Sequence, residues 1–100
     1  MPTETQIIAK KIRPYLENTL NMRVFKIHGN MFTEVGTPDL LCCSKEFGFC
    51  AFEVKKRGNE PTPVQFAVLR SIRSAGGKAG VVYIDSFEKD IMDILYGKQV

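Results

Sequence analysis

The 100-residue sequence has no tryptophan, one histidine and no long apolar run. Its longest unbroken apolar stretches, such as 40–43 and 81–84, are much shorter than the roughly 20 residues that a transmembrane helix needs. The opening Met-Pro-Thr-Glu-Thr-Gln lacks the charged and apolar regions of a secretory signal peptide. These absences exclude a membrane-spanning helix and favour a cytoplasmic location.

Cysteine is scarce, and its three positions, Cys42, Cys43 and Cys50, form no Cys-x-x-Cys pair. Adjacent residues of a strand point to opposite faces, so Cys42 and Cys43 cannot easily share one zinc ion. We therefore expect three reduced cysteines that act as small apolar residues in buried strands.

The net charge of +3 is also small, and it is unevenly distributed. Residues 1–84 carry twelve lysines and arginines against seven acidic residues, whereas residues 85–100 carry two against four. A mild basic excess is compatible with nucleic-acid binding but does not require it.

Helix and strand signals alternate along the chain. Thr3 and Gln6 form a potential capping box, and the apolar residues after them recur at helical spacing over about 3–20, with Pro14 as an interior defect. The expected strands are 22–28, 40–43, 49–55 and 79–84, with a short returning strand at 31–35, and the expected later helices are 62–75, capped by Thr62, and the segment after Ser86.

This order predicts one α/β domain over residues 1–100. Strands 40–43 and 49–55 should form an antiparallel hairpin, whereas the helix at 62–75 permits a parallel crossover to the last strand. The sheet is then mixed and flanked by helices. The sequence contains no linker, repeat or low-complexity segment.

Three charged residues interrupt the otherwise apolar strands. Asp39 begins one strand and Glu53 and Lys55 end the next, so a hairpin brings them together on one face. Charges on such covered strands are costly to desolvate unless they are paired or used. Two carboxylates can hold Mg²⁺, which lowers the pKa of a bound water, and a lysine can offset charge in phosphodiester hydrolysis. The alternative is an ion-paired cluster at the solvent rim of the sheet.

The runs Gly-Thr-Pro-Asp at 36–39 and Phe-Glu-Val-Lys at 52–55 resemble the PD-(D/E)XK nuclease motif. Together with Pro-Thr-Pro-Val-Gln at 61–65 and the strand at 79–82, they are similar to the VRR-NUC family, the virus-type replication-repair nuclease domain. The resemblance implies a restriction-endonuclease-like αβββαβ core and Mg²⁺- or Mn²⁺-dependent endonuclease activity on DNA. Small stand-alone members resemble Holliday-junction resolvases. This implies branched DNA as substrate, a homodimer, and replication or repair in a bacterial or phage-infected host cell.

The resemblance also implies roles for single residues. Glu4 is implied to be a metal ligand, and the alternative is a carboxylate that the helix dipole favours at this position. Gln65 is implied to be catalytic, and the alternative is that it forms half of a capping box with Thr62. His28 precedes a Gly-Asn turn and is expected to be a polar loop residue. The implied catalytic residues are Asp39, Glu53, Lys55 and Gln65, and the implied metal ligands are Glu4, Asp39, Glu53 and the backbone carbonyl of Val54.

Basic residues near the predicted site are candidates for phosphate contacts, which fix position without reading sequence. Lys56 and Arg57 lead directly out of the site. No recognition helix or zinc finger is present, so base readout is not indicated. Further basic residues could extend the surface or simply form a solvated helix face: Lys10, Lys11, Arg13, Arg70 and Arg73.

The sequence leaves functions of different classes open. One is a nuclease, and another is a non-catalytic module on a nuclease fold that binds branched DNA without cutting it. The intact Asp39, Glu53 and Lys55 favour the nuclease, since binding alone requires no carboxylates beside a phosphate. A metal-dependent hydrolase of some other phosphoester is less favoured, because basic residues lead out of the site and there is no nucleotide-binding glycine-rich loop. For the homodimer, the apolar segment 31–35 offers candidate surface, although it could equally fold back onto its own core.

Overall fold

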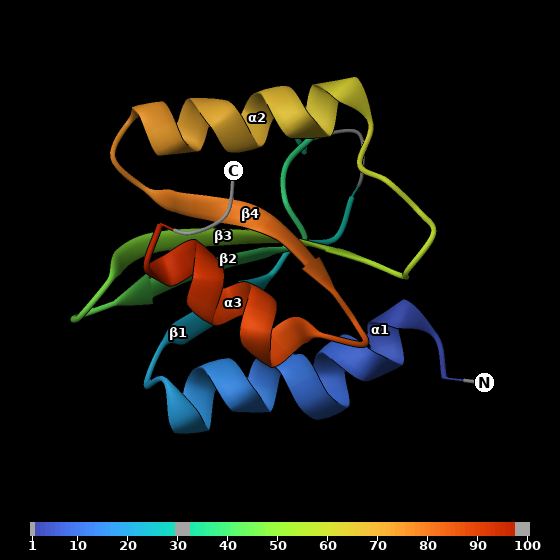
Figure 1. The fold of residues 1–100 in the computed structure, drawn as a ribbon, viewed down its shortest axis with the longest axis vertical. Coiled ribbons are helices and arrows are strands. Elements are labelled where there is room, and N and C mark those ends of the chain that lie inside the picture. The colour runs from blue at the N-terminus through green and yellow to red at the C-terminus, as the bar shows by residue number, and fades with distance from the viewer. Residues whose placement is uncertain (1, 30–32, 98–100) are drawn as a thin grey trace.

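A computed structural model describes residues 2–29 and 33–97, in which a four-stranded sheet lies between two helical layers (Figure 1). Helix α2 covers one face, and the N-terminal helix and α3 cover the other. The elements are α1 (Glu4–Ile7), the π-helical segments η1 (Ile8–Ile12) and η2 (Tyr15–Thr19), β1 (Arg23–Lys26), β2 (Leu40–Ser44), β3 (Gly48–Lys55), α2 (Pro63–Ser74), β4 (Lys78–Tyr83) and α3 (Phe87–Leu95). None of the helices in the two described stretches is long and apolar enough to cross a bilayer.

The sheet is mixed, with strand order β1-β2-β3-β4. β2 pairs antiparallel with both β1 and β3, and β3 pairs parallel with β4. Helix α2 forms the crossover connection between the parallel strands β3 and β4. It starts with the expected capping box between Thr62 and Gln65 and with Pro63 in its first turn. The fold class predicted from the sequence is therefore confirmed.

The N-terminal helix is irregular around Pro14, as expected, but the irregularity consists of two π-helical stretches and not of a break at the proline. Pro14 keeps helical angles of φ −60° and ψ −36°. Just before it, the N–H of Arg13 bonds to the carbonyl of Ile8, one residue further back than in an α-helix. These wider turns let the chain pass the proline without losing its apolar side, on which Ile8, Ile12 and Leu16 are buried.

The sheet separates two cores. The larger core lies towards the N-terminal helix and α3, and Phe52 and Val54 of β3 belong to it. The smaller core lies under α2 and is made of Ala51, Leu69, Ala79 and Val81. Successive residues of β3 therefore face opposite cores, as the apolar pattern on both faces predicts.

The cysteines are all free thiols, but they do not share one environment. Cys42 and Cys50 are register partners in the larger core. Burial is the main cause that raises the pKa of the Cys42 thiol to about 12 and that of the Cys50 thiol to about 11. Cys43 faces the other side and is exposed, so the expectation of burial is wrong for this residue. The reason is that α2 packs on β3 and β4 and leaves the outer part of that face open.

Two other expected elements differ from the structure. The strand expected at 22–28 is shorter, since β1 ends at Lys26. Of the strand expected at 31–35, residues 31–32 lie outside the described residues, and residues 33–35 form a loop. Ser86 precedes α3 as expected, but its hydroxyl bonds to Asp90 instead of capping a backbone N–H.

Candidate active site

An open pocket of about 330 Å³ lies where β2 begins and β3 ends. Asp39 and Glu53 line it from the sheet, Gln65 lines it from the first turn of α2, and the loop 33–37 completes its wall. Lys55 joins this group through an ion pair with Glu53. The fold thus gathers the four residues that the resemblance implies to be catalytic.

Asp39 is fixed at the start of β2 by bonds to both neighbouring strands. Its carbonyl accepts the N–H of Ile27 (2.8 Å), and its Oδ2 accepts the N–H of Val54 (2.8 Å). Continuing the β2–β3 register sets Pro38 opposite Val54. Because proline has no N–H, position 38 offers no backbone donor to the Val54 carbonyl. The Val54 carbonyl, on the side of β3 that faces Asp39, is thus left as a candidate oxygen ligand for a cation.

Glu53 is the buried centre of the site, with only 4% of its side chain exposed. Its Oε2 accepts a hydrogen bond from Gln65 Nε2 (3.3 Å) and lies 3.6 Å from Lys55 Nζ. Its Oε1 is buried and has no hydrogen-bond partner. A buried carboxylate oxygen without a partner is costly, so this atom points to a missing cationic or protonic partner.

The electrostatics of Glu53 lead to the same conclusion. Burial is the largest cause that raises its pKa to about 8, and the neighbouring Asp39 carboxylate raises it further. Lys55 acts in the opposite direction without cancelling these effects. The two carboxylates therefore repel each other unless a proton or a cation lies between them.

The donor set fits a hard divalent cation. Asp39, Glu53 and the Val54 carbonyl all offer oxygen, the ligand that Mg²⁺ and Mn²⁺ prefer. Within residues 2–29 and 33–97, no cluster of three or more acidic, histidine or cysteine side chains suited to a metal is present. Mg²⁺ commonly keeps several waters and uses one or two carboxylates, so the pair is sufficient for such an ion.

Gln65 forms the capping box and also lies at the candidate site, and its catalytic role stays a prediction. Its Oε1 accepts the N–H of Thr62 (2.8 Å), which completes the capping box, while its Nε2 donates to Glu53. Glu4 lies in the first turn of α1 and does not line the pocket, so its role as a metal ligand stays a prediction. His28 is an exposed residue whose carbonyl accepts the Thr33 hydroxyl, as expected of a loop position.

The basic residues are distributed over several surfaces. Lys10 is exposed on η1 and Arg70 is exposed on α2, so they belong to helical layers on opposite faces of the sheet. Lys56 is exposed directly after β3. One flat duplex surface cannot contact Lys10 and Arg70 together, and their roles in DNA binding stay predictions.

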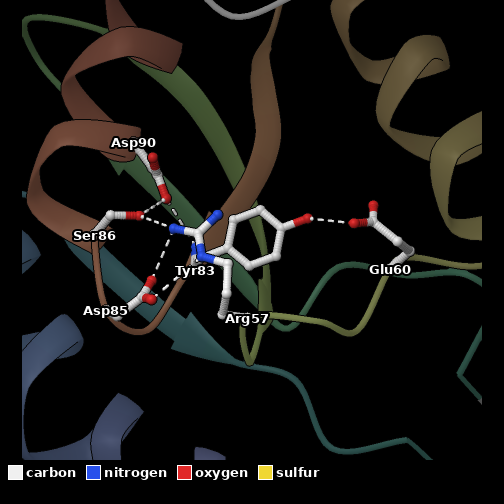
Figure 2. Close-up of polar contacts among 6 residues, drawn as sticks. All are labelled: Arg57, Glu60, Tyr83, Asp85, Ser86 and Asp90. Atoms are coloured by element: carbon white, nitrogen blue, oxygen red, sulfur yellow. Dashed lines mark hydrogen bonds and ion pairs between the residues drawn. The ribbon is translucent and has the colours of Figure 1, made fainter.

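Arg57 is already engaged within the protein (Figure 2). Its guanidinium donates to both carboxylate oxygens of Asp85 (3.2 and 2.8 Å) and to Ser86 Oγ (2.9 Å). It also lies 4.2 Å from the centre of the Tyr83 ring. These contacts join the loop after β3 to the end of β4, and the role of Arg57 in DNA binding stays a prediction.

Sequence reasoning missed two parts of this region. Tyr83, the register partner of Lys55, donates its hydroxyl to Glu60 and so ties the same loop at a second point (Figure 2). Glu34 lines the pocket from the loop that precedes Asp39. The position of Glu34 four residues before Pro38 was a usable signal, whereas the Tyr83 contact depends on the register of a parallel pair.

The sheet order, with an acidic pair at the ends of its central strands, is that of a nuclease-fold α/β domain. No protein-family model matches the sequence, and no curated protein matches it. A solved structure described as "VRR_NUC domain" is similar, with 25% sequence identity, a TM-score of 0.66, and coverage of 91% of this chain and 92% of that chain. This likeness confirms the predicted resemblance to the VRR-NUC family over nearly the whole sequence.

Proposed function

We propose that this domain is a divalent-cation-dependent DNA endonuclease that hydrolyses phosphodiester bonds, preferentially in branched DNA. The observation that carries the proposal is the buried Oε1 of Glu53, which lacks a partner while the Asp39 carboxylate lies beside it. A structural ion pair would satisfy its own buried oxygens, whereas a ligand site keeps one for its ligand.

Asp39, Glu53 and the Val54 carbonyl would hold the cation. When bound, Mg²⁺ or Mn²⁺ polarises a phosphate oxygen and acidifies a coordinated water. The chain's own groups supply orientation and charge. Gln65 is fixed by Thr62 and holds Glu53 Oε2, so this carboxylate keeps one orientation as substrate enters. The ammonium of Lys55 lies at the same oxygen, from which it can donate to a phosphate oxygen as negative charge develops.

The preference for branched DNA and the homodimer come from the resemblance and remain part of the proposal. One copy of the site cuts one strand, whereas resolving a four-way junction needs two cuts. A two-fold dimer presents two equivalent sites, related by the same symmetry as the junction. Lys56, which is exposed next to the site, is the proposed phosphate contact that positions the DNA.

The test uses labelled four-way junction, flap, single-stranded and duplex DNA, each with Mg²⁺, with Mn²⁺ and with chelator. We expect cleavage that requires the cation, with the branched substrates cut fastest. Asp39→Asn should abolish cutting with the fold intact, because it removes a ligand charge without removing volume. Glu46→Gln changes an exposed carboxylate in the β2–β3 turn and should cut like wild type. Binding of the junction without any cation-dependent cutting would identify the domain as a non-catalytic binding module instead.

A further inference from the structure

The sheet face that carries Asp39 and Glu53 continues beyond the pocket. Ile27, directly after β1, lines the pocket and continues the pairing with β2 through its bond to Asp39, and Phe25 and Arg23 precede it at alternating positions. Alternating residues of a strand point to one face, so all three share the face of the site. Phe25 therefore lies one row from the pocket, about 7 Å away along the strand.

This extension of the face is open to solvent. Helix α2 packs on β3 and β4, and the β1 side chains on the same face project beyond it. Phe25 is 50% exposed, its register partner Leu41 is half-buried, and Arg23 and Cys43 of the next row are exposed. Phe25 thus places an exposed aromatic ring on the face of the candidate site, within reach of a ligand that extends from the pocket.

Arg23 and Phe25 already form a stacked pair. The guanidinium of Arg23 lies over the Phe25 ring, 4.5 Å from its centre. Proteins bind single-stranded nucleic acid with this combination, because the ring stacks on a base while the cation attracts the phosphate backbone. In the rows of Arg23 and Phe25, the side chains that β1 and β2 place on this face are Arg23, Phe25, Leu41 and Cys43, so the charge in these two rows is that of Arg23 and attracts a polyanion.

We propose that Phe25, together with Arg23, stacks on an unpaired base of the DNA whose phosphate lies at Asp39 and Glu53. The inference rests on the proposed function and deepens it, since it assigns the preference for branched DNA to a particular surface. Bases inside a duplex are stacked on each other and cannot reach a ring on the protein. Flaps and single strands supply bases that can.

A second copy of this chain is the other occupant that the surface could take. Charge argues against it, because the rows of Arg23 and Phe25 in a second copy offer no acidic side chain for Arg23, and its Asp39 and Glu53 lie within its own pocket. The position of the pair beside the pocket argues for nucleic acid, because a DNA strand held at the pocket must leave it across a neighbouring surface. The stacked pair lies on one of these exits.

The experiment measures binding in the Asp39→Asn background, so that no cleavage interferes. The probes are a single strand with one 2-aminopurine, a flap and a blunt duplex of equal length. Phe25→Ala should weaken binding of the single strand and the flap by about 5- to 150-fold, with loss of the 2-aminopurine quenching. Duplex binding should stay nearly unchanged, and Phe25→Trp should restore the lost affinity. Phe49→Ala is the matched control, since Phe49 is 46% exposed on the same face but two strands away.

The outcomes separate this inference from the nuclease proposal. Equal loss on all three probes, or no loss on any, overturns the stacking role even if the wild-type protein cuts DNA. If Phe25→Ala selectively loses the single strand and the flap but the wild-type protein cuts no DNA, the stacking role stands and the nuclease proposal is wrong. If Phe25→Ala and Phe49→Ala both convert a dimer into a monomer in sedimentation, the face is an interface between copies and the proposal is wrong.

Discussion

Replacing Glu53 by glutamine should stabilise the cation-free fold at alkaline pH, although it removes a residue of the candidate site. The pKa of Glu53 is raised from an ordinary 4.5 to about 8, mainly by burial and then by Asp39. The folded protein therefore keeps a proton that the unfolded chain releases above pH 4.5. Wild-type stability falls as the pH rises from about 4.5 to about 8 and is level above that. Glutamine has no charge to desolvate and does not repel Asp39, so the variant lacks this loss.

The expected size follows from the shift. One pKa unit corresponds to about 1.4 kcal/mol, so the full window is worth about 5 kcal/mol as an upper value. The ion pair with Lys55 is lost in the variant and offsets part of this gain. For a domain of this length, each kcal/mol moves the melting temperature by roughly 4–8 °C. We therefore expect the variant to melt at least about 10 °C above wild type at pH 8.5, and close to it at pH 5.

The assay is thermal and urea unfolding followed by circular dichroism, in chelator, at intervals between pH 5 and pH 9. Saturating Mg²⁺ should close the gap at pH 8.5, because it stabilises wild type by about 3 kcal/mol at 100 times its Kd and has no comparable site in the variant. Glu46→Gln, at an exposed position, should follow the wild-type curve. A difference between variant and wild type that is equal at pH 5 and pH 8.5 would refute the reasoning about burial.

Three further predictions concern the neighbouring residues and the assembly. Lys55→Ala should lower kcat about 100-fold or more while nearly sparing DNA affinity, because its charge acts on the transition state; equal losses in cutting and binding would make Lys55 a phosphate anchor. Lys56→Ala should reduce the slope of DNA affinity against salt concentration by about 1. Arg57→Ala should change that slope less and should mainly lower the melting temperature, as should Asp85→Asn, because Arg57 and Asp85 bond to each other. A larger effect of Arg57→Ala than of Lys56→Ala on the slope would contradict a mainly structural role for Arg57. Light scattering at micromolar concentration should give twice the monomer mass, and a monomer that persists with junction DNA would contradict the paired-cut mechanism.

Much of the site could be predicted because its residues are fixed by local rules. Strand alternation alone assigns Glu53 and Lys55 to one face, and the hairpin brings Asp39 to them. The capping signal at Thr62 sets the first turn of α2, and Gln65 then projects from that turn towards the sheet. Each of these steps involves neighbours in sequence or one antiparallel pairing.

The features that escaped prediction depend on how separate elements are placed against one another. Arg57 meets Asp85 only because β4 returns beside β3 after the α2 crossover, so a residue expected to contact DNA is held by the protein itself. Cys43 reads as an apolar core residue, and its exposure follows from the lateral position of α2 over the sheet. Sequence periodicity specifies which face a side chain joins, but it does not specify which part of that face a helix covers.

The alternation of side chains in β2 also gives the protein a natural attachment point for a probe. Cys42 and Cys50 are enclosed in the larger core, and their pKa values are raised by burial, whereas Cys43 is exposed on the opposite face. A maleimide should therefore react with one thiol per native chain and with three only after unfolding. A fluorophore placed in this way lies in the same row as Arg23. It reports directly on whatever covers that face in solution, without an engineered cysteine.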